Sequence, residues 1–170
     1  NTLGTIVPDI VLPSSPSLIR GVEHVARARG YFLLVLESQG IHEVELEMFN
    51  LLSQRVDGIM LVTTGNHEWS AKAAQELKNA PPLICVDRVP EGLHVDSVCV
   101  DNLGAAEIGV AHLLSMGHRK IAIITGPLTL RNEQQRLQVI RQMNTNAIER
   151  LRFSAARTFA DAFLLPGRKQ

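Results

Sequence analysis

The chain has 170 residues, of which 45% are hydrophobic and 20% are charged, as in an ordinary globular domain or part of a two-lobed one. Its 17 basic residues balance 17 acidic residues, so the net charge favours neither nucleic acid nor an anionic membrane as a partner. No apolar run reaches the roughly 18 residues of a membrane helix, and the first residues lack the basic and apolar segments of a signal peptide.

Short apolar strands alternate with helices along the first part of the chain. A strand is expected at 3–8 and a helix at 15–29, with Gly30 placed to end that helix. A second strand is expected at 31–37 and a second helix at 42–54. The apolar face of this second helix would carry Val44, Met48, Leu51 and Leu52.

The same alternation continues through the middle of the chain. The next expected elements are a strand at 56–63, a weaker helix at 68–79 and strands at 83–87 and 97–100. A helix then begins at Asn102 and ends near Met116 and Gly117, and a strand follows at 120–125. Strands that are apolar throughout and separated by helices indicate a parallel sheet covered on both faces. The predicted fold class is therefore α/β, with a doubly wound parallel sheet.

The last part of the chain has a different pattern. From Leu130 to Gln170 there are eight basic residues against three acidic ones. No strand signal is present after Thr125, although the spacing of apolar residues is compatible with helix. We therefore expect a helical or irregular tail.

Motifs of the common enzyme classes are missing from the sequence. No glycine-rich dinucleotide or Walker A motif follows a strand, and no G-x-S-x-G elbow is present. The stretch HEWSA has Ala71 where a zinc-protease helix carries its second histidine. Cys85 and Cys99 lie in apolar runs and are expected to be buried, reduced thiols, which favours the cytoplasm. We predict no catalytic residue, no metal site and no cofactor.

Polar residues at strand ends are the candidates for ligand binding, because open α/β sheets bind ligands at the carboxyl ends of their strands. The long turn after the first strand carries Ser14, Ser15 and Ser17, which either contact a sugar or anion or cap the next helix. Asp87 and Arg88 follow a later strand, and they form either a ligand contact or a local salt bridge.

Two further candidates lie later in the chain. Asp101 and Asn102 begin a helix rich in small residues, and we expect them mainly to cap it, because both side chains accept hydrogen bonds from first-turn N–H groups. Arg131 and Arg136 follow the strand that ends at Gly126. The planar guanidinium of such an arginine either clamps a carboxylate, phosphate or sugar hydroxyl, or is simply exposed.

Taken in order, several of these segments resemble the effector-binding core of the LacI/GalR family of bacterial transcription repressors. The segments are LGTIVPDI, RVDGI, PLICVDR, VDN, GHRKIAIITGP and the RL at 136–137. The resemblance covers about Leu3 to Leu137. It implies a fold like the type I periplasmic binding proteins, in which two lobes close around a small effector.

The resemblance also implies a division of the chain. Residues 1–118 would form the first lobe, 119–137 the start of the second, and 138–170 a divergent tail, explained by truncation or a change of reading frame. The helix-turn-helix head that reads operator DNA in the family would precede the chain and is missing from it.

The resemblance places eight residues at the effector. Arg136 matches the arginine with which the family grips the effector from the second lobe. Ser14 and Ser15 stand where the family has aromatic side chains, so stacking on a ring would be lost while hydroxyl contacts remain. The implied effector-binding residues are Pro13, Ser14, Ser15, Asp87, Arg88, Asp101, Asn102 and Arg136.

The sequence therefore predicts the sensing core of a cytoplasmic, homodimeric transcription regulator, which binds a sugar or sugar acid between its lobes and is not an enzyme. Two alternatives remain. One is the sugar-binding protein of a transport system, and the other is a small α/β enzyme of flavodoxin-like plan.

Overall fold

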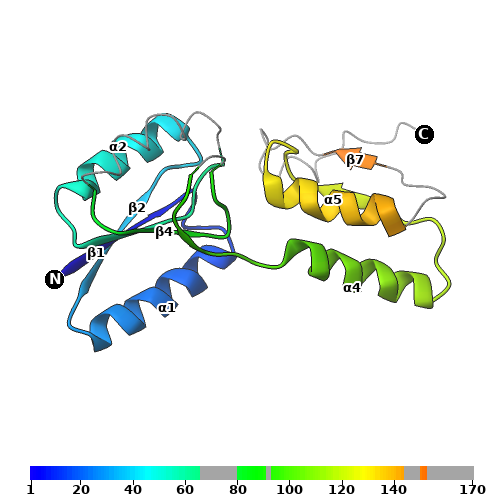
Figure 1. The fold of residues 1–170 in the computed structure, drawn as a ribbon, viewed down its shortest axis with the longest axis horizontal. Coiled ribbons are helices and arrows are strands. Elements are labelled where there is room, and N and C mark those ends of the chain that lie inside the picture. Colours follow the sequence, from blue (N-terminus) through cyan, green and yellow to red (C-terminus); the bar gives the residue numbers. More distant parts are fainter. Residues whose placement is uncertain (66–79, 91–92, 144–149, 153–170) are drawn as a thin grey trace, which may run out of the picture. The chain divides into compact units, whose positions relative to one another are not determined.

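The computed structural model of the protein describes residues 1–65, 80–90, 93–143 and 150–152, and these form two compact units, Asn1–Val100 and Asp101–Gln170 (Figure 1). The weaker helix expected at 68–79 lies outside the described residues. The division after Val100 differs from the lobe boundary expected after residue 118. The physical reason is that the helix of residues 102–115 packs against a later helix of the second unit.

The first unit is built on a five-stranded parallel sheet in the order β2-β1-β3-β4-β5. Its strands are β1 (Thr2–Val7), β2 (Phe32–Glu37), β3 (Gly58–Leu61), β4 (Leu83–Val86) and β5 (Asp96–Val98). Helices α1 (Ser14–Ala28) and α2 (His42–Ser53) lie on opposite faces of this sheet (Figure 1). The predicted doubly wound α/β architecture is confirmed, because the strand pairs of this sheet are parallel and α1 and α2 connect the first three strands.

The core of the first unit lies between α2 and the sheet. Phe49 and Leu52 of α2 are fully buried against apolar side chains of β1, β3 and β4. Gly4 in β1 makes this close packing possible, because a Cβ there would lie 2.7 Å from Leu52 Cδ1. The buried face of α2 differs from the predicted one, and its members are His42, Glu45, Phe49 and Leu52.

The second unit contains two packed helices and a short parallel ribbon. Its elements are α4 (Asn102–Ser115), β6 (Ile123–Thr125), α5 (Arg131–Met143) and β7 (Arg150–Arg152). The helices lie side by side (Figure 1), with Val110 and Ile140 buried in one cluster with Ile121. Strand β7 pairs with β6, so the expectation of a strand-free tail is wrong at these three residues.

Two helix ends agree with the sequence analysis. Gly30 follows α1 with φ of 76°, and Gly117 follows α4 with φ of 89°. Glycine adopts this left-handed conformation without the steric cost of a Cβ. The chain can therefore reverse direction directly after each helix and enter the next segment.

Candidate functional site

A polar network in the second unit joins the first turn of α4 to the first turns of α5. Arg136 donates from Nη1 to Oδ1 of Asn102 at 2.8 Å and from Nη2 to Oε1 of Glu133. The other carboxylate oxygen of Glu133 accepts from the backbone N–H of Gly126 at 3.2 Å. The network therefore lies at the carboxyl end of β6, the edge where parallel strands present ligand-binding groups.

Asp101 and Asn102 have different roles although they are adjacent. Asp101 is the N-cap of α4, and its Oδ1 accepts from the N–H of Gly104 at 2.9 Å. A side chain at Gly104 would crowd this cap, since a Cβ would lie 2.4 Å from Oδ2 of Asp101. The capping prediction is thus confirmed for Asp101, whereas the buried Asn102 holds Arg136.

The serines after β1 do not cap the next helix. Pro13 is at the N-cap of α1, and no side chain accepts a hydrogen bond there. Ser15 is buried and donates from its hydroxyl to the carbonyl of Asp9 at 2.6 Å, which fixes the turn. Ser14, like Pro13, is exposed at the helix start. Of the two interpretations, capping is wrong, and ligand contact stays a prediction for Pro13, Ser14 and Ser15.

Asp87 and Arg88 form the local salt bridge that was one of their two interpretations. Nε of Arg88 lies 3.1 Å from Oδ2 of Asp87, and Nη1 donates to the carbonyl of Thr63 at 3.3 Å. Asp87 has φ of 69°, a left-handed conformation that aspartate adopts more readily than most residues. The pair thus bridges the carboxyl ends of β4 and β3, and a ligand contact by it stays a prediction.

The sequence analysis missed a buried polar cluster at the end of β3. Glu45 of α2 is fully buried, and its carboxylate accepts from the hydroxyl of Thr63 at 2.8 Å and from the N–H of Thr64 at 2.6 Å. Within the described residues, Nδ1 of His42 and Oγ1 of Thr64 are buried without a hydrogen-bond partner. Loss of solvation raises the pKa of Glu45, although its hydrogen bonds offset part of the shift. The threonines directly after the strand were the sequence signal for this cluster.

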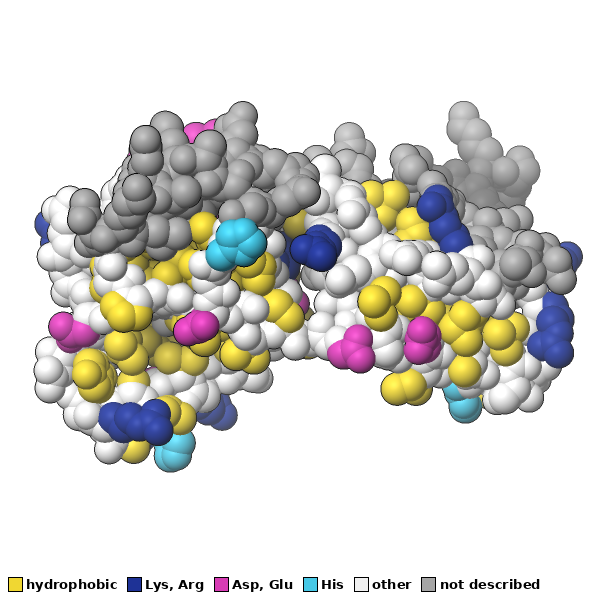
Figure 2. All heavy atoms as spheres, in the orientation of Figure 1, with side chains coloured by type: hydrophobic (Ala, Val, Ile, Leu, Met, Phe, Trp, Pro, Cys, Tyr) yellow, Lys and Arg dark blue, Asp and Glu magenta, His cyan; other side chains and the backbone are white. Residues whose placement is uncertain are grey.

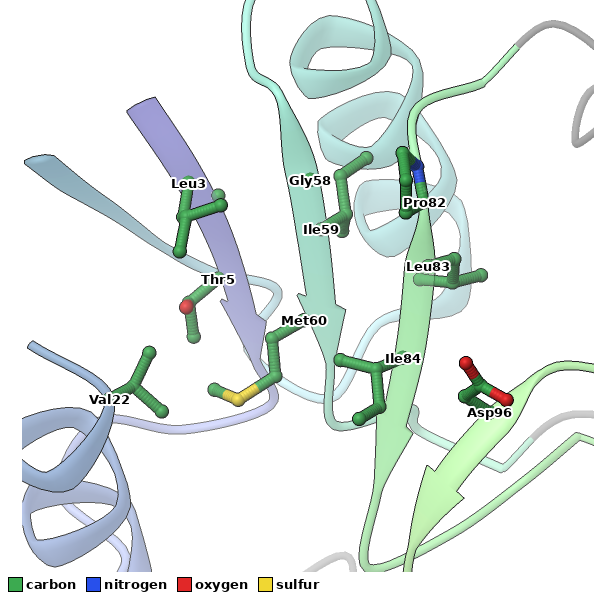
Figure 3. Close-up of a pocket in the computed structure, with 11 residues that line it drawn as sticks. Leu3, Thr5, Val22, Gly58, Ile59, Met60, Pro82, Leu83, Ile84 and Asp96 are labelled. Atoms are coloured by element: carbon green, nitrogen blue, oxygen red, sulfur yellow. The ribbon is translucent and has the colours of Figure 1, made fainter. Parts of the chain in front are cut away.

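The first unit also has an apolar depression of about 300 Å³ between α1 and the sheet (Figure 3). Val22 of α1 and the strand residues Thr5, Met60 and Ile84 line it, and Asp96 lies at one side. Sugar sites need several converging polar groups, and this depression provides few. None of the predicted binding residues lines it, so we do not assign the effector site there.

The cysteines and possible metal ligands among the described residues do not form a catalytic centre. Cys85 is buried, but Cys99 is exposed, so the prediction of two buried thiols is wrong for Cys99, which lies just beyond the short strand β5. Burial raises the pKa of Cys85 to about 12, with smaller effects from Cys99 and Glu45. The described part of the chain has no cluster of three metal-binding side chains and no helix suited to crossing a membrane.

Comparisons with known proteins agree with this architecture. A family profile described as periplasmic binding proteins and the sugar-binding domain of the LacI family matches residues 1–144. The HTH-type transcriptional repressor CytR of Escherichia coli K12 is 32% identical over 127 residues, which are 74% of this chain and 37% of the repressor. The chain thus spans less than half of the length of that repressor.

Two solved structures are also similar to the chain. The Cra transcriptional dual regulator of Pseudomonas putida, in complex with fructose 1-phosphate, is 31% identical with a TM-score of 0.79. A LacI-family regulator of Enterococcus faecalis V583 with bound ribose is 26% identical with a TM-score of 0.76. Each match covers 91% of this chain and 58% of the other chain.

Proposed function

Since the chain belongs to the family of periplasmic binding proteins and LacI-type sugar-binding domains, we propose that it is the effector-sensing core of a DNA-binding transcription regulator. The observation that carries this proposal is the position of Arg136. Its guanidinium lies at the carboxyl end of β6, held by Asn102 and Glu133. Its place in the sequence resembles that of the arginine with which the LacI/GalR family grips the effector, and this resemblance supports the proposal.

The proposed effector is a small sugar-like molecule or sugar acid. The side chain of Arg136 is 38% exposed, so it remains accessible while its hydrogen bonds hold it in place. Arginine donates five N–H groups from a rigid plane, which suits hydroxyl and carboxylate oxygens. Among similar proteins, one structure contains fructose 1-phosphate and another contains ribose.

In the first unit, the exposed turn at Pro13 and Ser14 and the Asp87–Arg88 pair follow β1 and β4, so they are the proposed contributors from that unit. Ser15 and Asp101 would support the site through the turn and the cap that they stabilise. None of these groups forms a nucleophile–base pair, which fits a binding protein better than an enzyme.

Regulation would follow from differential affinity. An effector that binds one conformation better than another shifts the population toward it, and this shift would change operator binding by a helix-turn-helix head outside the chain. The regulator would act as a homodimer in the cytoplasm and without a cofactor. CytR, a transcriptional repressor, supports the regulatory role.

The alternative is the sugar-binding protein of a transport system, because the matching family also contains periplasmic binding proteins. The coding sequence upstream of Asn1 discriminates between them. A helix-turn-helix pattern there supports the regulator, whereas a signal peptide supports the transport protein.

The direct test is calorimetric titration of the chain with ribose, fructose, gluconate and fructose 1-phosphate. We expect at least one of them to bind, and Arg136→Gln to weaken that binding by about tenfold or more, since hydrogen bonds from a charged donor are strong. The control is Arg141→Gln, which removes an equal charge from an exposed position on the same helix. Equal affinity of the two variants would contradict the proposed role of Arg136.

A further inference from the structure

The guanidinium of Arg136 already has a negative partner inside the second unit. Glu133 lies one turn earlier on α5, and Oε1 of its carboxylate accepts from Nη2 of Arg136. Nη1 is directed to the neutral amide oxygen of Asn102. Both terminal nitrogens therefore face an acceptor of the protein itself, and one of these acceptors carries a full negative charge.

The carboxylate of Glu133 is fixed rather than free to swing away. Its side chain is only 16% exposed, and Oε2 accepts from the N–H of Gly126 at 3.2 Å. The absence of a side chain at Gly126 leaves room for it, because a Cβ there would lie 3.2 Å from the carboxylate carbon. Glu133 is also in the first turn of α5, where the helix dipole favours a negative charge.

We propose that Glu133 determines effector specificity by neutralising Arg136, so that the protein selects a neutral, hydroxyl-bearing ligand over a sugar acid or sugar phosphate. This inference rests on the proposed function and narrows it. A carboxylate or phosphate gains most from a guanidinium when it takes both terminal nitrogens and meets an uncompensated charge. Here Glu133 holds one nitrogen and repels a second anion.

A neutral hydroxyl group is affected less by the negative charge of Glu133. It needs one N–H donor, and it does not suffer the charge repulsion that a second anion would experience beside Glu133. Removing the charge of Glu133 without changing its shape should therefore raise affinity for anions relative to affinity for neutral sugars. Glu133→Gln does this. Its single amide oxygen can still accept from Gly126, while its NH2 group cannot accept from Arg136, so Nη2 becomes available to a ligand.

The test compares matched ligand pairs: fructose with fructose 1-phosphate, and ribose with ribose 5-phosphate. Calorimetry on the unchanged protein should show tighter binding of the neutral member, and Glu133→Gln should shift the ratio toward the phosphate by about tenfold or more. The control is Glu107→Gln, an exposed position on α4, which should leave the ratio unchanged. Preference of the unchanged protein for the phosphates, or an unaltered ratio in Glu133→Gln, would overturn the proposal.

Inorganic phosphate separates this inference from the proposed function. Nitrogen NMR of the Arg136 side chain should show no response to millimolar phosphate in the unchanged protein, a saturable response in Glu133→Gln, and none in Glu133→Gln/Arg136→Gln. If no sugar binds any variant, the proposed function fails while the phosphate titrations still decide the inference. If the unchanged protein responded to phosphate as strongly as Glu133→Gln does, the proposed role of Glu133 would be overturned. The phosphate titration of the unchanged protein does not depend on the folding of any variant.

Discussion

The buried carboxylate of Glu45 allows a strong prediction about stability. Glu45→Ala removes the acceptor for two donors, the buried hydroxyl of Thr63 and the partly buried N–H of Thr64. A buried donor without a partner costs about 1–3 kcal/mol. Two such losses add, but alanine also removes the cost of burying a charge. The net effect should lower the free energy of unfolding by about 2–4 kcal/mol.

Urea denaturation followed by circular dichroism measures this change. The matched control is Glu47→Ala, an exposed position on the same helix, which should change the unfolding free energy by no more than about 0.5 kcal/mol. If Glu45→Ala were as mild as Glu47→Ala, the hydrogen bonds to Thr63 and Thr64 would not stabilise the fold, and the reasoning would be refuted.

The pH dependence provides a second measurement on the same residue. The folded pKa of Glu45 is raised above the ordinary value of 4.5, so the folded state keeps this proton to higher pH than the unfolded state. Stability from this group is therefore complete below 4.5 and decreases as the pH rises through the folded pKa. Glu45→Gln, whose amide can bond to both threonines, should lack this decrease. A pH profile identical to that of the unchanged protein would contradict the assignment.

Three further predictions concern other parts of the chain. With a thiol reagent near neutral pH, Cys99 should react quickly and Cys85 only after denaturation, because burial raises the pKa of Cys85 to about 12; mass spectrometry showing equal labelling would contradict this. Asp101→Ala should destabilise α4 by about 1 kcal/mol, whereas Asp101→Asn should cost less. Amide hydrogen exchange across α4 measures the difference, and equal exchange in the two variants would contradict the prediction. The chain should self-associate with increasing concentration, because Phe32 and Val98 of the sheet are exposed; sedimentation as a monomer at all concentrations would contradict this.

The prediction of self-association depends on hydrophobic side chains that are exposed on the first unit. Hydrophobic side chains are visible in several patches on the face of the first unit drawn in Figure 2. The exposed fraction is 79% for Phe32 and 61% for Val98, both in edge strands of the sheet. Edge strands with exposed apolar residues are common sites of association.

The strands and helices could be predicted because their signals are local. An apolar run bounded by Pro, Gly or Asp identifies a strand, and each expected strand up to 120–125 is present with ends shifted by a few residues. Those shifts have a physical cause: β3 extends only from Gly58 to Leu61, since the ladder ends where the neighbouring strands β1 and β4 stop pairing with it. Strand β7 was missed because it is short and rich in arginine.

The buried face of α2 was predicted only in part, since Leu52 is fully buried and Met48 packs against the core, and the errors have a cause outside the helix. Hydrophobic spacing favoured Leu51, which is 44% exposed, and excluded Glu45, which is fully buried. A charged side chain is stable in the core only where hydrogen-bond donors pair with it. For Glu45 the donors lie at the end of β3, 18 residues along the chain. No pattern within α2 contains that information.

The candidate site shows the same division between local and distant signals. Asp101 was recognisable as a cap from its position before a helix, because its bond to Gly104 spans three residues. The bond between Arg136 and Asn102 spans 34 residues, and only the packing of α4 on α5 creates it. Glu133 had no sequence signal of its own, although it is the residue that forms an ion pair with Arg136.

If Arg136 contacts the effector as proposed, the charge balance around it should matter more for specificity than the arginine itself. The arginine has two protein partners of different charge, neutral Asn102 and anionic Glu133. Asn102 contributes a neutral acceptor to the guanidinium, whereas Glu133 contributes a negative charge that opposes its positive one. A protein that kept Arg136 and Asn102 but had a neutral residue at position 133 would present the same geometry and attract an anion instead. On this proposal, the resemblance of an arginine to its family counterpart suggests where a site lies, and the residues that pair with it would decide which effector fits.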